Sequence, residues 1–430
     1  MANNLSPARE AALKTLYAVE KEGAYLNIAL NDIIHEAKLD DRDAALCTEL
    51  VLGVERNRLF LDNIIENLST LKLKKISVWI LNILRMGIYS LRFLDKIPQS
   101  ATINECVKLA KRYGHQKSSG FVNAVLRKAV TSGDFLPEEG TEEYLSVFYS
   151  YPGWIITKWK SEKVKDIEPL LKAGNINPPT YLRKNLLKGD FEIPEGFEKA
   201  PLGKNSYIYT KGGAFHGSKL QKEGYFSIQD VASQLAVEAL DPKEGMEVLD
   251  LCAAPGGKSE YAAELMGNKG HVVACDLYPH KTELIEKSAE RLGIKIIETR
   301  VNDAEKYEKD FEEKFDRVLL DAPCSGLGII RRKPDIKWTK AAMDCSALAK
   351  TQYKMLRNAT HYVKKGGILV YSTCTISKME NQQTVQMFLR ENKNFEALPT
   401  EYMNEKGYCQ LYPNVDNTDG FFIARFVRRD

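Results

Sequence analysis

The chain has 430 residues, of which 44% are hydrophobic, and this is enough apolar material for more than one buried core. Its formal net charge is only +3, so any affinity for nucleic acid must come from local basic clusters. The eight cysteines lie far apart, which excludes a C-x-x-C zinc or redox pair, and we expect no metal site. With no signal peptide and no long apolar run, the sequence predicts a cytoplasmic protein whose thiols stay reduced.

Residues 1–140 have the apolar spacing of an all-helical domain. Leucines and isoleucines recur on one helical face, as in Leu13 and Leu16 and again in Ile76 and Ile80. A stretch rich in turn residues follows and marks the end of this domain.

Residues 141–224 lack the regular helical spacing of residues 1–140. Asn177-Pro178-Pro179 and several glycines separate short strand-like and helical pieces, which predicts a small mixed α/β module. From residue 225 to 430, apolar runs alternate with helical stretches, and this alternation predicts a mostly parallel, doubly wound sheet, that is, a Rossmann-like α/β domain. The candidate strands are 248–250, 272–276, 294–299, 318–321 and 368–372.

A glycine-containing turn follows the first of these strands. Its glycines allow a ligand to approach the backbone, and the free N–H groups of the next helix can hold a carboxylate such as that of methionine. Asp276 follows Gly256 at close to the spacing of about 20 residues at which an acid meets ribose hydroxyls, and Asp303 follows the third strand, where it can accept a hydrogen bond from adenine. These placements predict an adenosine-containing cofactor. The predicted cofactor-binding residues are Cys252, Ala253, Ala254, Pro255, Gly256, Gly257, Lys258, Asp276, Asp303 and Asp321.

Two other ligand classes compete for this turn. A dinucleotide site requires G-x-G-x-x-G, which is absent, and an ATP-binding P-loop requires a glycine where Cys252 stands, although Gly257-Lys258-Ser259 resembles its end. Any one of the acids alone is typical of a strand end or a helix cap. The prediction of a cofactor site therefore rests on their joint placement.

Cys324 and Cys374 each follow an apolar run at the carboxyl end of a predicted strand, where open α/β sheets bind ligands. Such a pair suits covalent chemistry on a pyrimidine. One thiolate adds to C6 of cytosine and activates C5 towards a methyl sulfonium, and a second group serves as base or relay when the C5 proton leaves. Asp321, when protonated, can hydrogen-bond N3 of the ring, and Lys258 can orient Asp321 or a thiolate. The cysteines interpreted as inert are Cys47, Cys106, Cys252, Cys275, Cys345 and Cys409.

Together these motifs resemble the NOL/NOP/Sun family of RNA cytosine-C5 methyltransferases. The resemblance covers residues 225–426, and it implies S-adenosylmethionine as the cofactor, Cys374 as the nucleophile and Cys324 as the thiol that assists product release. Spacing alone leaves the reverse assignment of the two thiols open. The motifs that carry the resemblance are Cys252–Lys258, Asp276, Asp303, Asp321–Gly326, Arg331–Asp335, Ser372–Cys374 and Asp419–Phe422.

The N-terminal region resembles the helical RNA-binding fold of the antitermination factor NusB, through Asn104–Val107 and Phe121–Arg127. Such a domain ahead of such a methyltransferase resembles bacterial small-subunit rRNA methyltransferases, which implies a cytosine of 16S rRNA as the substrate, free or in an assembling particle. A tRNA substrate and a non-catalytic ribosome-assembly factor stay open as alternatives. We expect a monomer.

Basic side chains gather in two places where they can bind RNA phosphates. The same charges are routine on the exposed faces of helices, so the clusters alone favour neither interpretation. The first cluster comprises Lys108, Lys111, Arg112, Lys117, Arg127 and Lys128, and the second comprises Arg331, Arg332 and Lys333.

Overall fold

The structure is a computed structural model, and it describes residues 5–211 and 215–430. By its internal contacts the chain forms two compact units. The helical unit consists of Met1–Asn175 and Lys333–Thr339, and the sheet unit consists of Ile176–Arg332 and Lys340–Asp430.

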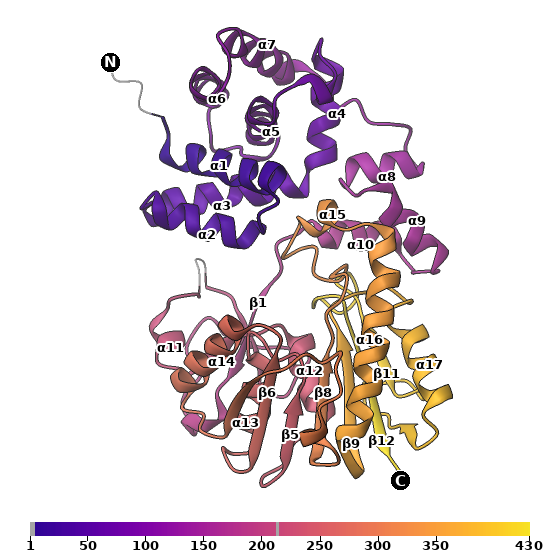
Figure 1. Cartoon of the computed structure of the whole chain (residues 1–430). Helices are drawn as coiled ribbons and strands as arrows, with labels where there is room; N and C mark the ends of the chain where they lie inside the picture. The colour runs from indigo at the N-terminus through magenta and orange to yellow at the C-terminus, as the bar shows by residue number, and fades with distance from the viewer. Residues whose placement is uncertain (1–4, 212–214) are drawn as a thin grey trace. The chain divides into compact units, whose positions relative to one another are not determined.

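The helical unit is packed around one buried helix, α5 (Val78–Phe93), which contacts α1, α3, α4, α6 and α7. This arrangement confirms the helical domain predicted from leucine and isoleucine spacing. The other helices, drawn from indigo to magenta and in orange in Figure 1, are α1 (Pro7–Glu22), α2 (Leu26–Glu36), α3 (Asp41–Arg56), α4 (Arg58–Leu68), the 3₁₀ turn η1 (Leu73–Lys75), α6 (Gln99–Tyr113), α7 (Ser118–Thr131), α8 (Glu142–Phe148), α9 (Gly153–Ser161), α10 (Ile167–Gly174) and α15 (Ile336–Thr339).

The helical unit extends beyond the boundary expected at residue 140, because α8, α9 and α10 belong to it. Tyr151 and Trp159 of this region are fully buried. The segment Lys333–Thr339 is also part of this unit, and its buried Lys337 donates hydrogen bonds to the carbonyl of Arg56 at 2.7 Å and to Oδ1 of Asn175 at 3.2 Å. The internal contacts place residues 141–175 in the helical unit and residues 176–224 in the sheet unit. The division into three domains at residues 140 and 224 stays a prediction.

The main sheet of the sheet unit has the order β10-β12-β9-β8-β5-β6-β7, and β11 pairs with β12. The neighbours from β7 to β9 are parallel, whereas β10, β11 and β12 pair antiparallel. The mostly parallel sheet expected from the alternating pattern is thereby confirmed. Its strands are β5 (Glu247–Asp250), β6 (His271–Asp276), β7 (Ile297–Val301), β8 (Phe315–Asp321), β9 (Val363–Thr373), β10 (Phe395–Ala397), β11 (Tyr408–Leu411) and β12 (Phe421–Arg428).

Two strand predictions need correction. The third strand begins at Ile297 rather than at residue 294, because Ile294 instead packs against the helix that precedes it and donates its N–H to the carbonyl of Ala289. Strands β10, β11 and β12 were not among the candidates; most residues of β12 are buried, and it pairs antiparallel with β9.

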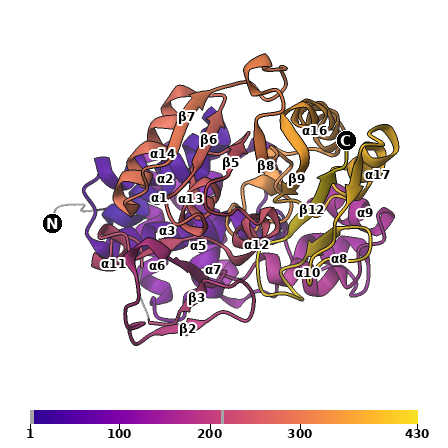
Figure 2. The ribbon, with the colours of Figure 1, turned by 90° about the horizontal axis from the view of Figure 1, so that it is seen from below.

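Helices cover both faces of this sheet, as Figure 2 shows, with α12, α13 and α14 on one face and α16 and α17 on the other. Alternate residues of one strand serve the two cores: Val248 packs with the first group of helices and Leu249 with the second. The carboxyl ends of the parallel strands therefore meet at one edge, where loops supply the chemistry. The helices are α11 (Lys219–Lys222), α12 (Val231–Leu240), α13 (Gly257–Leu265), α14 (Pro279–Leu292), α16 (Ala342–Tyr362) and α17 (Gln382–Glu391), with the 3₁₀ turns η2 (Leu186–Lys188) and η3 (Lys309–Phe311).

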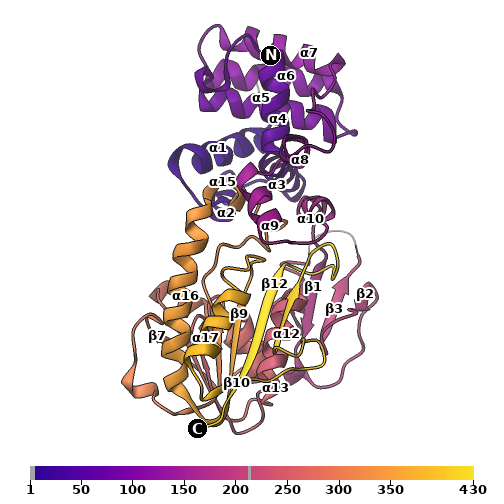
Figure 3. The same ribbon diagram turned by 90° about the vertical axis from the view of Figure 1, so that its right-hand side faces the viewer.

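A second, antiparallel sheet has the order β2-β3-β1-β4, and Figure 3 shows β1 and β3 side by side. Arg183 of its strand β1 is fully buried, and its guanidinium donates to Oε1 of Glu264 at 2.8 Å and to the carbonyl of Gly257 at 2.6 Å. The small sheet is thus attached to the start of α13. Its strands are β1 (Thr180–Lys184), β2 (Phe197–Lys199), β3 (Ser206–Tyr209) and β4 (Phe226–Ile228).

Candidate active site

The predicted glycine turn lies between strand β5 and helix α13. Gly256 is the residue before the helix and has φ +113°, a conformation that side chains rarely adopt. A Cβ atom at Gly256 would lie 3.2 Å from Oε1 of Glu260 and 3.3 Å from Cγ2 of Ile285. Gly256 therefore places no side chain at the start of α13, where unpaired backbone N–H groups favour an anionic ligand group.

Acidic residues lie at the ends of the three strands next to this turn. Asp276 is the last residue of β6, and Asp303 follows β7. Asp250 ends β5 and is 1% exposed; its Oδ2 accepts a hydrogen bond from Ser259 at 2.7 Å, and burial raises its pKa to about 6. Among the described residues, Oδ1 of Asp250 and Nδ2 of Asn302 are buried without a hydrogen-bond partner. Such groups fit a polar ligand like adenosine, because buried polar atoms are rarely left unpaired.

The structure brings the two predicted cysteines together. They follow β8 and β9, which are parallel neighbours with Asp321 opposite Ser372, and their Sγ atoms are 3.2 Å apart. The hydrogen bond to Cys374 and burial raise the pKa of Cys324 well above its ordinary value. Cys324 therefore keeps its proton, as a thiol in hydrogen-bond contact with Cys374.

Asp321 forms an ion pair with Lys258, with Oδ2 and Nζ 2.6 Å apart, and its Oδ1 accepts a hydrogen bond from Ser372 at 2.7 Å. Burial opposes the charge of Lys258, but the Asp321 carboxylate raises the pKa of Lys258 above its ordinary value, and Cys374 adds to this effect. Both oxygens of Asp321 act as acceptors here. A hydrogen bond from a protonated Asp321 to N3 of the base stays a prediction.

A buried polar group behind the thiols was missed by the sequence reasoning. Glu380 accepts hydrogen bonds from the backbone N and Oγ of Ser325 at 2.9 and 2.6 Å, and Ser325 also contacts Oγ1 of Thr375 at 2.8 Å. Ser325 and Thr375 directly follow Cys324 and Cys374. A hydroxyl residue after each cysteine was the signal available in the sequence, but nothing in it pointed to Glu380.

Comparisons with known proteins bear on this arrangement. A family model described as 16S rRNA methyltransferase RsmB/F matches residues 237–427, and a NusB family model matches residues 6–131. The chain is 40% identical to the probable ribosomal RNA small subunit methyltransferase B of Bacillus subtilis (strain 168) and 32% identical to that of Synechocystis sp.; the matches cover 98% of this chain and 98% and 99% of the relatives.

The chain belongs to this methyltransferase family. The crystal structure of the protein PH0851 is similar to it over 99% of each chain, with a TM-score of 0.84 and 26% sequence identity. A second crystal structure, of a methyltransferase homologue from Pyrococcus horikoshii, covers 68% of this chain and 100% of its own, with a TM-score of 0.60 and 27% identity. The family expected from the motifs, the NusB-like helical domain and the Rossmann-like methyltransferase domain are thereby confirmed.

In this member of the RsmB/F family, the loop after Cys324 packs directly on the turn before β12. The N–H of Gly328 donates to the carbonyl of Cys374 at 3.1 Å, and the N–H of Gly420 donates to the carbonyl of Gly328 at 2.9 Å. A Cβ atom at Gly328 would overlap the carbonyl oxygen of Gly420. Two glycines thus allow a backbone contact that holds the two cysteine loops and the β12 turn together.

Gly328→Ala is expected to lower the free energy of unfolding of the sheet unit by about 2 kcal/mol or more, because one of the two backbones must move. Thermal unfolding followed by circular dichroism measures this effect. Gly120→Ala in α7 is the control, since no atom lies within 4 Å of its added Cβ and alanine favours helix. An unfolding temperature of Gly328→Ala equal to that of the unmodified protein would contradict the close approach.

The predicted RNA-binding residues divide into buried and exposed side chains. Arg331 is 3% exposed, and its Nε lies 2.9 Å from Oδ1 of Asp419, while Arg332 pairs with Asp419 at 2.6 Å and Asp230 at 2.7 Å. This network engages both guanidinium groups within the sheet unit, so the structure differs from the phosphate contact expected for Arg331. The residues with exposed side chains are Lys111, Arg112, Lys117, Arg127, Lys128 and Lys333, and Lys108 is half-buried beside Glu105.

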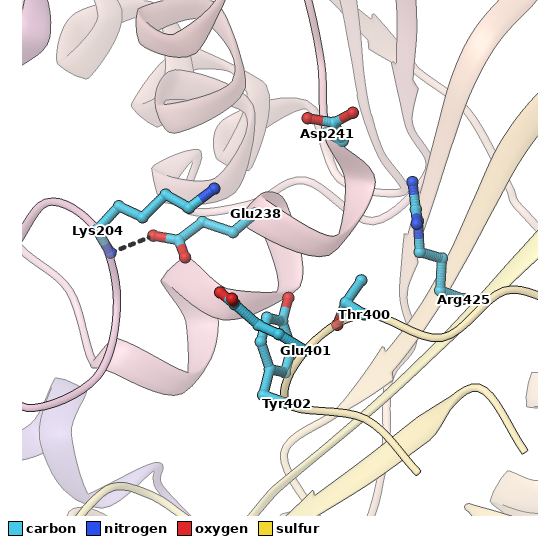
Figure 4. Close-up of a pocket in the computed structure, with 7 residues that line it drawn as sticks. All are labelled: Lys204, Glu238, Asp241, Thr400, Glu401, Tyr402 and Arg425. Atoms are coloured by element: carbon cyan, nitrogen blue, oxygen red, sulfur yellow. Dashed lines mark hydrogen bonds between the residues drawn. The ribbon is translucent and has the colours of Figure 1, made fainter. Parts of the chain in front are cut away.

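One cavity of about 270 Å³ in the sheet unit, drawn in Figure 4, lies between α12, β12 and the residues before β11. Its lining includes none of the predicted site residues and mixes Lys204 and Arg425 with Glu238, Asp241 and Glu401. Within residues 5–211 and 215–430, no cluster of histidine, cysteine or acidic side chains is arranged to hold a metal ion. No helix in the same described part is long and apolar enough to cross a bilayer.

Proposed function

We propose that this protein methylates C5 of a cytosine in 16S rRNA, with S-adenosylmethionine as the methyl donor and a covalent bond between Cys374 and C6 of the base as the intermediate. The observation that carries the proposal is the pair of thiols 3.2 Å apart at neighbouring strand ends. The substrate follows from the names of the relatives and from the NusB-like domain. Free thiols also agree with the cytoplasmic location predicted from the sequence.

The residues at the carboxyl ends of β5 to β7 suit the cofactor. The first turn of α13 would hold the carboxylate of S-adenosylmethionine, and Asp276 would hold its ribose hydroxyls. Asp303 and the unpaired amide of Asn302 would hold its adenine ring. When bound, S-adenosylmethionine supplies a methyl group on a sulfonium, which is an electrophile.

The thiols perform the steps on the base. The Cys374 thiolate adds to C6, and the electron pair displaced from the C5–C6 double bond makes C5 nucleophilic, so that C5 takes the methyl group. Once Cys324 has released its own proton to water, its thiolate accepts the C5 proton; the C5–H electron pair then restores the double bond, and the C6–S bond breaks to give back the Cys374 thiolate. Lys258 and Asp321 lie beside Cys374 and orient the base during addition.

The substrate is tested by bisulfite sequencing of RNA from a strain that lacks the gene. One cytosine of 16S rRNA is expected to lose its methyl mark, and purified protein is expected to restore it with tritiated cofactor. Complementation with Cys374→Ala, which keeps the fold, serves as the matched control and is expected to leave the cytosine unmethylated. Loss confined to tRNA would overturn the ribosomal assignment, and no loss in any RNA would favour a non-catalytic assembly factor.

A further inference from the structure

Glu380 is a fully buried carboxylate behind the two thiols, with 0% of the residue exposed. Its oxygens accept hydrogen bonds from the backbone N and hydroxyl of Ser325 and from Nε2 of Gln352 at 3.0 Å. All three donors are neutral groups. Burying a carboxylate costs more free energy than burying a neutral amide of the same shape with the same partners. The presence of a carboxylate at this buried position therefore calls for an explanation.

The hydrogen bonds of Glu380 connect the two cysteine loops. Its side chain holds Ser325, which follows Cys324, and its backbone carbonyl accepts a hydrogen bond from the hydroxyl of Tyr371 in β9 at 2.7 Å. Gln352 adds a second connection, since its amide also donates to the carbonyl of Pro323 at 2.9 Å. The position of Cys324 relative to β9, and so to Cys374, therefore depends on Glu380.

The charge of Glu380 also acts on the thiol itself. The hydrogen bond to Cys374 and burial are the largest causes of the raised pKa of Cys324, and the negative charges of Cys374 and Glu380 add to them. Cys374 and Glu380 are the ionisable groups that raise the pKa of Cys324, and burial together with Cys324 and Glu380 raises the pKa of Tyr371. A thiol held protonated in this way is a stronger base once it has lost its proton.

We propose that Glu380 is a positioning residue for product release, which holds Cys324 against Cys374 and makes Cys324 a more effective acceptor of the C5 proton. This inference rests on the proposed function. It assigns Glu380 no contact with the base and no part in the addition of Cys374 to C6. Its removal therefore affects the decay of the covalent adduct and leaves its formation unchanged.

The test uses the full chain, 16S rRNA and S-adenosylmethionine, with samples quenched at intervals and the adduct measured on denaturing gels. Compared on the plateau of the pH profile, where Cys324 is deprotonated, Glu380→Gln is expected to form the adduct at the normal rate and to release it roughly 10- to 100-fold more slowly, because a displaced and less basic thiolate takes up the C5 proton less well. The pH at which release reaches half its maximum is expected to move down, because removal of the charge lowers the pKa of Cys324. Glu391→Gln is the control, because its carboxylate lies at the end of α17, the helix that follows Glu380, but is exposed and bonded to Tyr353.

Two further variants separate this role from a general loss of structure. Ser325→Ala keeps the charge of Glu380 but removes one hydrogen bond, so it is expected to slow release without moving the pH profile. In a Cys324→Ala background, Glu380→Gln is expected to change the adduct lifetime no further, because it acts through Cys324.

Normal adduct decay in Glu380→Gln, or a further slowing in the Cys324→Ala background, would overturn the inference. If thermal unfolding shows that Glu380→Gln does not fold, the test rests on Ser325→Ala. A normal rate of adduct release by Ser325→Ala would then overturn the inference, and a slower rate would support it. Failure of the proposed function looks different, because Cys324→Ala itself would then trap no adduct.

Discussion

Cys374→Ala is expected to slow methyl transfer by on the order of 10⁴-fold or more and to form no covalent complex with RNA. C5 of cytosine is a poor nucleophile until a group adds at C6, and Cys374 directly follows β9, 3.2 Å from the thiol of Cys324, whose own pKa is raised. The measurement is tritiated methyl incorporation into 16S rRNA under single-turnover conditions.

Cys409→Ala is the matched control for this prediction. Cys409 lies in β11 of the same unit, is 8% exposed, and burial raises its pKa to about 12, so its thiol has no role in the proposed reaction. Activity close to normal is expected for it. Equal losses in the two variants would attribute the effect of Cys374→Ala to the fold rather than to the nucleophile.

Cys324→Ala is expected to accumulate the covalent RNA–protein adduct and to stop after about one turnover. Addition at C6 and methyl transfer need only Cys374, whereas release of the product needs a group that takes up the C5 proton. The side chain 3.2 Å from the Cys374 sulfur is the one placed to do so. A slowly migrating band on a denaturing gel, sensitive to nuclease, would report the adduct.

The same pair of variants distinguishes the two assignments of the thiols. An adduct in Cys374→Ala and none in Cys324→Ala would exchange their roles, as the sequence spacing alone allows. The raised pKa of Cys324 argues against that exchange, because a thiol that keeps its proton is the weaker nucleophile.

The sheet could be predicted where burial leaves a local pattern. Val248 and Leu249 serve opposite cores, so β5 is apolar throughout and is bounded by turn residues that mark it in the sequence. The antiparallel strand β12 was not predicted, because its partner β9 is distant in the chain and no local pattern indicates such pairing. The place of Lys333–Thr339 in the helical unit was not predicted for the same reason, since the hydrogen-bond partners of Lys337 are Arg56 and Asn175.

That the candidate site residues lie together was predictable, because strand ends of a parallel sheet converge at one edge. Cys324, Cys374, Asp321 and Lys258 all lie within one connected cluster, as expected. The basic pair Arg331 and Arg332 was harder to interpret. Their charges are visible in the sequence, but their partners Asp230 and Asp419 are separated from them by about a hundred residues, so ion pairing and phosphate binding gave the same local pattern.

The most direct test of the account is to locate the covalent bond. The adduct trapped by Cys324→Ala can be digested with nuclease and protease, and the modified peptide identified by mass spectrometry. The account predicts a methylated cytosine nucleotide on the peptide that carries Cys374. A nucleotide on any other residue, or complete methylation of the cytosine by a protein without the Cys374 thiol, would contradict it.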